Sequence, residues 1–177
     1  MKIKKSERLL KEVAVGETLE IGEYEFIILE HTSNGTAVLL KNCLAFKMPF
    51  DKYTGNWKES SLRKYLNNEF ATKIENEVGC ENLLTHNVNL ITDDGLTDYG
   101  TTFDKVSLLT TELYRKYRYD IGENLSEYWW TCTAETLTSN YVKCISPLGV
   151  ILNHYFFNCT EGVRPFCVLN SNMFVYE

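Results

Sequence analysis

The side chains that most often carry catalysis or bind metal ions are sparse in this sequence and lie far apart. The three histidines, His31, His86 and His154, have no carboxylate or second histidine at a spacing that holds a metal ion. The sequence also lacks a glycine-rich phosphate loop, a Gly-x-Ser-x-Gly nucleophile turn and a His-Glu-x-x-His zinc motif. We therefore expect no catalytic residue, no metal ion and no cofactor, and we expect each histidine to pack or to face solvent.

Cysteines are the remaining source of reactive side chains. The six are Cys43, Cys80, Cys132, Cys144, Cys159 and Cys167. The closest two lie eight residues apart, so no Cys-x-x-Cys pair exists, and a reducing compartment would leave them as small buried thiols. No secretory signal opens the chain, and no run approaches the ~20 apolar residues of a membrane span. We expect a cytoplasmic protein without disulfides, with one reactive thiol as the alternative.

An acidic stretch, Asp93, Asp94 and Asp98, could suggest a calcium site. An EF-hand loop needs alternating oxygen ligands, a central glycine and a distal glutamate, and this stretch does not follow that pattern. We interpret it as an ordinary Asp-Gly turn.

Composition limits the class of protein. The chain has 177 residues with 44% hydrophobic and 24% charged side chains, which suits one globular domain. Its net charge of −6 makes direct binding to nucleic acid unexpected. The basic residues Lys2, Lys4, Lys5, Arg8 and Lys11 crowd the start of the chain. We expect a basic N-terminal helix or arm (1–14), one domain (15–170) and a C-terminal tail (171–177).

The periodicity of apolar residues predicts the elements that position these side chains. Leu62–Val78 is the most regular segment, a helix capped by Ser60-Ser61 and ended by Gly79. Asn34-Gly35 predicts a hairpin, and Pro147-Leu148-Gly149 predicts a turn. Other predicted elements are helices over Ser6–Val13 and Glu112–Arg118, and two strands around Gly22 within Val15–Leu29. Further strands are predicted at Thr36–Leu40, Asp104–Leu109, Tyr128–Thr133, Tyr141–Ile145, Val150–Phe157 and Val163–Leu169, and a turn-rich segment follows Leu90-Ile91. Many strands with few helices predict an α+β fold with antiparallel sheets.

The C-terminal strands carry the residues best suited to binding a partner. Neither face of Val150–Phe157 is purely apolar, because polar and aromatic side chains alternate along it. Tyrosine and asparagine offer adaptable contacts at low entropic cost. The predicted binding residues are Asn140, Tyr141, Asn153, His154, Tyr155 and Asn158. The alternative is that these side chains lie beneath a loop or along a solvated strand edge.

Other distinctive residues are expected to be structural. Trp129 and Trp130 should point to opposite faces of a strand, one into the core and the other to a surface or under a loop, where an exposed indole could anchor a partner. Arg164, beside many aromatic residues, should be buried against a carboxylate or backbone carbonyls. The expected structural set is Trp57, Arg63, Trp129, Trp130 and Arg164.

Several of these residues occur in blocks that follow one order. The blocks are Val15-Gly16, Ile21-Gly22-Glu23-Tyr24, Trp57–Asn67 with Phe70, Asp104–Thr110 with Glu112, Tyr128-Trp129-Trp130, Gly149, and Gly162-Val163-Arg164-Pro165. In them, from about residue 12 to 169, the chain resembles a domain of unknown function common in Firmicutes and their phages. The resemblance implies a C-type-lectin-like fold, related to formylglycine-generating enzymes and to the variable proteins of diversity-generating retroelements.

The chain departs from these relatives at three points. After Trp130 the family usually has Leu-Arg-Ser-Pro, where this chain has Thr131-Cys132-Thr133-Ala134. The Glu-Pro-Asn and Trp-Asn-Asp motifs of calcium-dependent lectins are missing, so calcium-dependent sugar binding is not expected. The closely spaced cysteine pair of formylglycine-generating enzymes is also missing.

Three functions are therefore hypotheses. The first is a non-catalytic ligand- or protein-binding module of bacterial or phage origin, whose partner is another protein. The second is a phage-encoded inhibitor of a host defence system, for example an anti-CRISPR, whose acidic surface would occupy a basic nucleic-acid channel. The third is a formylglycine-generating-type oxidase using copper. It would need two thiols among Cys132, Cys144, Cys159 and Cys167 to meet in space.

Overall fold

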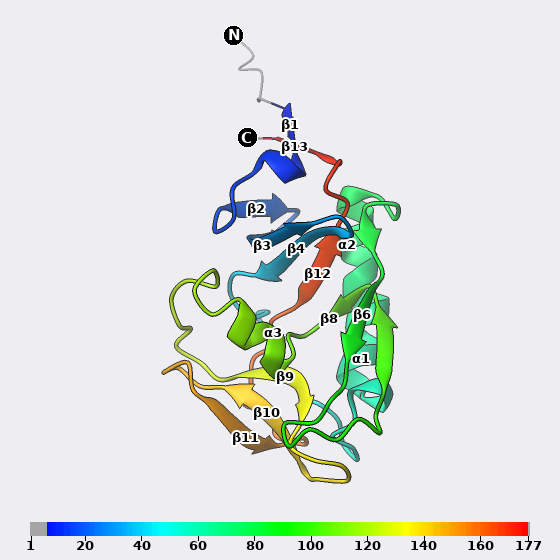
Figure 1. Cartoon of the computed structure of the whole chain (residues 1–177), viewed down its shortest axis with the longest axis vertical. Helices are drawn as coiled ribbons and strands as arrows, with labels where there is room; N and C mark the ends of the chain where they lie inside the picture. Colours follow the sequence, from blue (N-terminus) through cyan, green and yellow to red (C-terminus); the bar gives the residue numbers. More distant parts are fainter. Residues whose placement is uncertain (1–6, 177) are drawn as a thin grey trace.

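The computed structural model describes residues 7–176 and consists of antiparallel sheets with few helices (Figure 1), which confirms the expected α+β class. The strands are β1 (Glu7–Leu9), β2 (Thr18–Ile21), β3 (Tyr24–Thr32), β4 (Gly35–Leu40), β5 (Leu83–Leu84), β6 (His86–Asn89), β7 (Thr101–Asp104), β8 (Val106–Ser107), β9 (Trp129–Ala134), β10 (Tyr141–Ile145), β11 (Ile151–Tyr155), β12 (Phe166–Leu169) and β13 (Phe174–Tyr176). The helices are α1 (Ser61–Tyr65), α2 (Ala71–Val78) and α3 (Thr111–Lys116).

The strands form one large sheet and three smaller ones. The six-stranded sheet has the order β2-β3-β4-β12-β5, with β8 also paired to β12. A three-stranded sheet has the order β11-β10-β9, and the pairs β1–β13 and β6–β7 complete the set.

Turn residues set the register of the large sheet. β2 and β3 meet across the turn at Gly22, and β3 and β4 meet with Thr32 opposite Gly35. Gly35 has a φ of +131°, and a Cβ there would lie 2.7 Å from the carbonyl oxygen of Leu169 on β12. Glycine is therefore required where β4 passes β12. The hairpins predicted at Gly22 and Asn34-Gly35 are confirmed.

One long helix covers residues 61–78 and consists of α1, a π-helical turn at Leu66–Phe70, and α2. The Ser60 hydroxyl caps it by accepting the Arg63 N–H at 3.1 Å. Its fully buried side chains recur every four residues, at Leu62, Leu66, Phe70 and Ile74. In an ordinary α-helix of 3.6 residues per turn, side chains four residues apart shift progressively around the helix axis. The wider π-helical turn offsets this shift and keeps the four side chains on one face. The predicted helix is confirmed, but the π-helical turn was not predicted.

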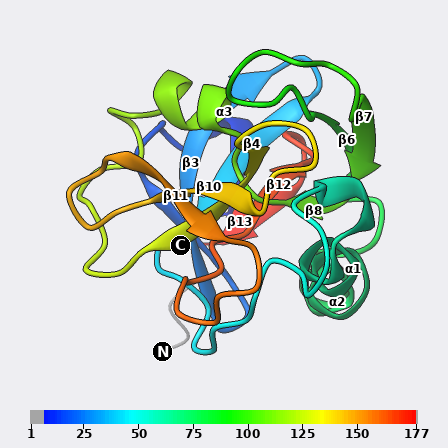
Figure 2. The same ribbon diagram turned by 90° about the horizontal axis from the view of Figure 1, so that it is seen from below.

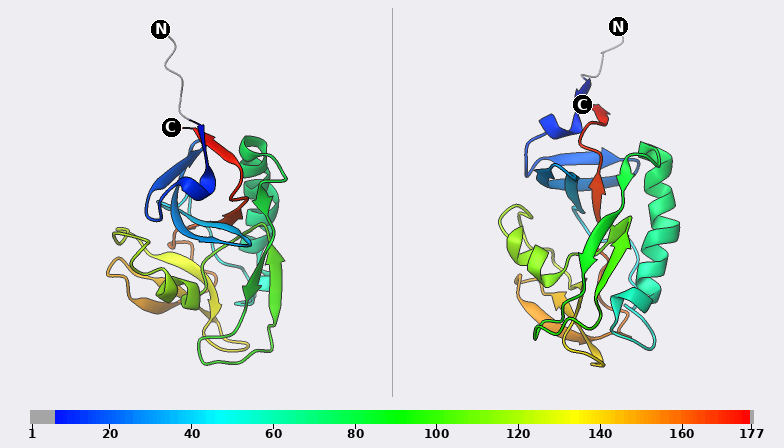
Figure 3. Two further views of the ribbon diagram at one scale, coloured as in Figure 1. Left: turned by 45° about the horizontal axis from the view of Figure 1, so that its top comes forward. Right: turned by 45° about the vertical axis from the view of Figure 1, so that its right-hand side comes forward.

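Two cores lie on opposite faces of the large sheet. Successive residues of β3 alternate between them, with Phe26 in the core that contains the long helix and Ile27 in the core that contains α3 and Trp129. Figure 3 shows the long helix along one side of the molecule and α3 away from it. The sequences of the central strands β3 and β4 contain nearly continuous apolar runs because both faces of these strands are buried.

The two ends of the described chain pair with each other through β1 and β13. The helix predicted over Ser6–Val13 is wrong for its described part, which is β1 followed by a 3₁₀ turn at Leu10–Glu12. The first N–H of that turn donates to the carbonyl of Met173, so pairing with the C-terminal segment replaces helical bonding. The expected tail (171–177) contributes β13. Lys2, Lys4 and Lys5 lie outside the described residues.

The β6–β7 hairpin was not predicted. β6 and β7 have few apolar residues, so their sequences do not show a hydrophobic strand pattern. Thr102 and Asp104 of β7 are nevertheless buried, because they hydrogen-bond inside the domain. The turn-rich residues 90–100 form the connection between the two strands.

Candidate functional site

The β9–β10–β11 sheet, seen from below in Figure 2, carries exposed aromatic residues on the face that α3 covers at one end. Tyr141 of β10 lies opposite Tyr155 of β11. Backbone bonds from Phe156 to Asn140 and from Ser146 to Val150 fix which pairs of the ladder are hydrogen-bonded. Tyr141 and Tyr155 are then a non-hydrogen-bonded pair, the kind in which cross-strand side chains come closest.

These two tyrosines and Phe157 form an aromatic stack. The Tyr141 and Tyr155 ring centroids are 4.5 Å apart at 29°, and Phe157 extends the stack at 5.2 Å and 17° from Tyr155. The Tyr141 hydroxyl donates to that of Tyr155 at 2.8 Å, and this bond raises the pKa of Tyr141. Tyr155 and Phe157 are 41% and 51% exposed, so the aromatic stack faces solvent.

Paired polar groups border the aromatic stack. Asn153 lies on the same face as Tyr155 and opposite Lys143. The Asn153 amide donates to the carboxylate of Glu135, and the Lys143 ammonium lies 3.0 Å from Asp93. The domain thus pairs the Lys143 charge and hydrogen-bonds the Glu135 carboxylate itself, and the surface between them is aromatic with tyrosine hydroxyls.

Three of the six predicted binding residues meet on this face: Tyr141, Asn153 and Tyr155. Asn140 and Asn158 lie in the loops at the ends of the strands, where their backbones bond to Phe156 and Tyr155. Phe157 was missing from the predicted binding residues; it lies in the turn after β11, where its ring stacks on Tyr155.

His154 faces away from the aromatic stack. Its Nδ1 bonds to the carboxylate of Glu161, a fully buried residue whose same oxygen accepts from the Thr160 hydroxyl at 3.0 Å. The ring of Tyr128 lies 4.9 Å from the imidazole. His154 therefore belongs to a separate cluster that joins β11 to the loop before β12, and sequence reasoning did not identify Glu161.

Trp57 and Arg63 meet at Asp104, a second buried carboxylate that the sequence did not single out. The Trp57 indole donates to Oδ2 at 2.8 Å, and the Arg63 guanidinium lies 2.7 Å from Oδ1. Thr102 donates to Oδ2 at 2.9 Å. Asp104 is thus satisfied on both oxygens and connects the long helix to β7.

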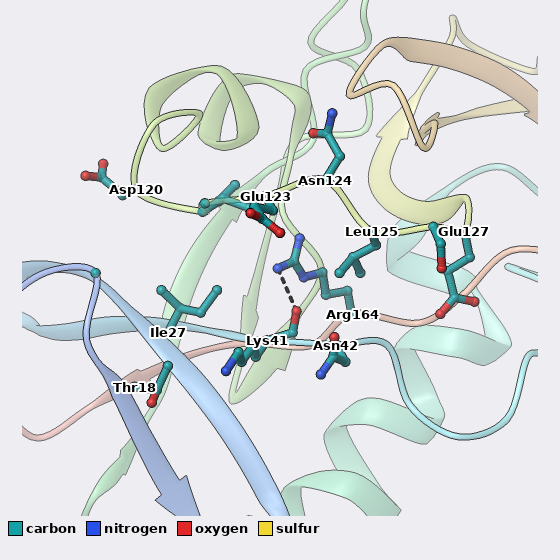
Figure 4. Close-up of a pocket in the computed structure, with 14 residues that line it drawn as sticks. Thr18, Ile27, Lys41, Asn42, Asp120, Glu123, Asn124, Leu125, Glu127 and Arg164 are labelled. Carbon is teal, nitrogen blue, oxygen red and sulfur yellow. Dashed lines mark hydrogen bonds between the residues drawn. The ribbon is translucent and has the colours of Figure 1, made fainter.

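Arg164 lines a pocket of about 640 Å³ between the loop 120–127 and the start of the large sheet (Figure 4). Its guanidinium donates to the carbonyls of Leu40 and Lys41 at 2.8 and 2.9 Å and lies 5.0 Å from the Trp129 ring centroid. Burial lowers its pKa to about 10, so the group stays charged at neutral pH. The predicted burial of Arg164 against carbonyls agrees with this geometry.

Both indoles of Trp129 and Trp130 are buried, on opposite faces of β9. The Trp130 N–H donates to the carbonyl of Met48 at 3.2 Å, and Trp129 packs against Tyr114 at 5.7 Å. The alternative in which one of them is an exposed anchor is therefore wrong.

The cysteines are all free thiols, and Cys132, Cys144 and Cys167 are buried. Burial raises the pKa of Cys144 to about 12, so its thiol stays protonated near neutral pH. In the acidic stretch, Asp94 accepts from the Thr92 hydroxyl within the turn at Gly95. Among residues 7–176, no three His, Cys, Asp or Glu side chains gather to hold a metal ion.

No protein-family model, curated protein or solved structure matches this chain. The resemblance to the Firmicutes and phage domain, and the C-type-lectin-like fold that it implies, therefore remain predictions. Within the part of the chain that the structure describes, no helix has the length and apolarity to cross a bilayer.

Proposed function

We propose that this protein is a non-catalytic module that binds another protein through the aromatic stack and Asn153. The observation that carries the proposal is a stack of three aromatic rings at the end of a regular sheet, in which Tyr155 and Phe157 are exposed and Tyr141 is half-buried. Exposed tyrosines combine apolar area with a hydroxyl at low entropic cost, which is why they are common in protein interfaces.

A protein suits this surface better than a nucleobase or a sugar ring. The facing surfaces of Tyr141, Tyr155 and Phe157 already contact one another, so a flat ligand has no room between them. Ring edges and the hydroxyls remain, which favours contact with apolar and hydrogen-bonding side chains of a partner. The neighbouring Lys143 is paired with Asp93 inside the domain, so its charge adds little attraction for an anionic ligand.

The thiols support a binding role over a copper oxidase. A copper–thiol enzyme needs accessible thiolates, whereas burial raises the pKa of Cys132, Cys144 and Cys167 and keeps them protonated. Cys80 and Cys159 are exposed free thiols, which supports the further proposal that the protein works in the reducing cytoplasm.

We also propose that the fold is C-type-lectin-like. Two helical regions, small antiparallel sheets and long loops are what the family resemblance implies, and the arrangement in Figure 1 is compatible with it. A solved structure of a member of that family would test this assignment.

The test of function is a Tyr141→Ala/Tyr155→Ala double variant. The immobilised full chain is incubated with extract of its native host, and the retained proteins are quantified by mass spectrometry. We expect the double variant to keep its fold and to lose the partners that the unchanged protein retains. Tyr119→Ala is the matched control, because Tyr119 is 97% exposed and lies outside the aromatic stack. A folded double variant that retains the same partners would contradict the proposal.

A further inference from the structure

β11 forms one edge of its sheet, and no strand among the described residues pairs with its free side. In an antiparallel pair, alternate residues turn their backbone N–H and C=O groups toward the neighbouring strand. In β11 these residues are Leu152 and His154, whose groups point toward β10. Those of Ile151, Asn153 and Tyr155 point outward, with the Tyr155 carbonyl already accepting from Asn158 at 3.0 Å. The free edge therefore offers a row of donors and acceptors to another strand.

This edge lacks the features that normally protect one. Edge strands of monomeric proteins are usually interrupted by lysine, proline or a bulge. Val150–Phe157 contains no Lys, Arg, Asp, Glu, Pro or Gly, and β11 pairs with β10 in unbroken register. Its exposed apolar residues are between 39% and 51% exposed and lie on both faces: Val150, Leu152, Tyr155 and Phe157. A strand with this composition is suited to being covered by another strand.

We propose that a second copy of this chain covers the edge, with the two β11 strands antiparallel about a two-fold axis at Asn153. This register makes the strand complementary to itself. Asn153 faces Asn153 of the second copy, so the two amides can hydrogen-bond. Ile151 faces Tyr155, an aliphatic–aromatic pair, and Leu152 faces His154 on the other side of the sheet. No two like charges meet, and the outward backbone groups form about four bonds between copies.

The symmetric pairing is what favours a second copy over an extended segment of another protein. Every position along the strand finds a compatible partner in the same sequence, and two-fold dimers are the commonest protein oligomers. The axis runs perpendicular to the sheet, so both aromatic stacks lie on the same face of one continuous six-stranded sheet. The dimer does not depend on the proposed function, but it would present the proposed binding surface twice.

The proposal is tested by sedimentation equilibrium of the full chain at concentrations up to about 1 mM. We expect the unchanged protein to approach twice the 20.5 kDa mass of one chain. Asn153→Pro removes an N–H that the fold does not use and places a ring at the edge, so it should raise the dissociation constant about tenfold or more while the chain stays folded. Asn153→Ala keeps the N–H and is the control for the lost amide. It should still dimerise.

Hydrogen exchange keeps the test decisive if Asn153→Pro does not fold. In the unchanged protein, the amides of Asn153 and Tyr155 should exchange more slowly as the concentration rises, whereas the Ile151 amide gains no acceptor because the Tyr155 carbonyl is already used by Asn158. The proposal is overturned if the unchanged protein stays monomeric, if a folded Asn153→Pro dimerises equally well, or if exchange at the amides of Asn153 and Tyr155 is independent of concentration.

Discussion

Two nitrogens of the Arg63 guanidinium bind the same oxygen of Asp104, at 2.8 and 2.7 Å. The other carboxylate oxygen accepts from Trp57 and Thr102, so a side chain that is almost fully buried has all its strong acceptor sites used. Because Arg63 lies on α1 and Asp104 ends β7, this pair holds the long helix against a hairpin that has little apolar surface of its own.

Replacement of Asp104 should therefore be among the most damaging single changes. Asp104→Ala leaves the Trp57 N–H and two of the three Arg63 guanidinium nitrogens without their acceptor, while the third keeps its bond to the Lys58 carbonyl, and we expect a loss of roughly 3–5 kcal/mol in the free energy of unfolding. Urea denaturation measures it. Glu25→Ala is the control, since Glu25 and Lys41 form an exposed 2.8 Å pair that should be worth less than about 1 kcal/mol. A loss below about 1 kcal/mol in Asp104→Ala would show that this cluster is not structural.

Arg164 should stabilise the fold through its planar group rather than its charge alone. Arg164→Ala removes two bonds to carbonyls and the contact with Trp129, and we expect a loss of about 3 kcal/mol. Arg164→Lys keeps the charge but cannot reproduce the fork, so it should recover only part of this loss. Thermal unfolding of both variants, with the exposed Arg115→Ala as control, gives the comparison. Equal melting temperatures for all four proteins would refute this role.

His86 should make stability depend on pH. Burial lowers its pKa from 6.5 to about 4, against the opposing charge of Asp104, so the folded protein favours the neutral imidazole. The unfolded chain takes up the proton first as the pH falls. Stability is therefore complete above pH 6.5 and decreases between pH 6.5 and 4.

The contribution of His86 to the pH dependence of stability is measured by comparing the unchanged protein with His86→Gln, whose side chain does not titrate. Between pH 7 and pH 4.5 the unchanged protein should lose about 2–3 kcal/mol more than the variant. Chemical denaturation at several pH values measures both curves. Parallel curves would mean that His86 titrates normally in the folded protein.

Gly35 should not tolerate a side chain. Its φ of +131° is unfavourable for other residues, and the new Cβ would press on the Leu169 carbonyl, so we expect Gly35→Ala to cost about 2–4 kcal/mol. Gly95→Ala is the matched control, because Gly95 also has a positive φ of +95° but open space around its Cβ. It should cost about 1 kcal/mol. Equal losses in a denaturation experiment would show that the contact with β12 does not matter.

Sequence patterns predicted the elements that are determined by interactions between residues close in the sequence. The Asn34-Gly35 hairpin, the capped helix from Ser61 to Val78 and strand β10 all have turn, cap or alternation signals in their own sequence. The β6–β7 hairpin has no such signal, because Val88 is its one buried apolar residue and the buried Asp104 depends on partners distant in sequence, Trp57 and Arg63. The helix predicted near the N-terminus failed for a related reason, since pairing with β13 determines that segment.

The candidate site was only half visible in the sequence. Alternation along β11 correctly grouped Asn153 and Tyr155, and pairing with β10 added Tyr141. His154 was included because it is polar, yet its partner Glu161 is seven residues away across a loop that no pattern predicts. The sequence also did not show which aromatic residues are exposed. Trp130 and Phe157 look equally suited to binding, but only Phe157 reaches solvent.

The pairing of β1 with β13 decides how this protein can be joined to anything else. The two strands lie together at the end of the molecule opposite the β9–β10–β11 sheet (Figure 1). A tag, a surface attachment or a neighbouring domain at either terminus would therefore leave from the same end and keep clear of the aromatic stack. A short linker between the two strands would also allow a circularly permuted chain, cut at an exposed loop, to keep the same fold.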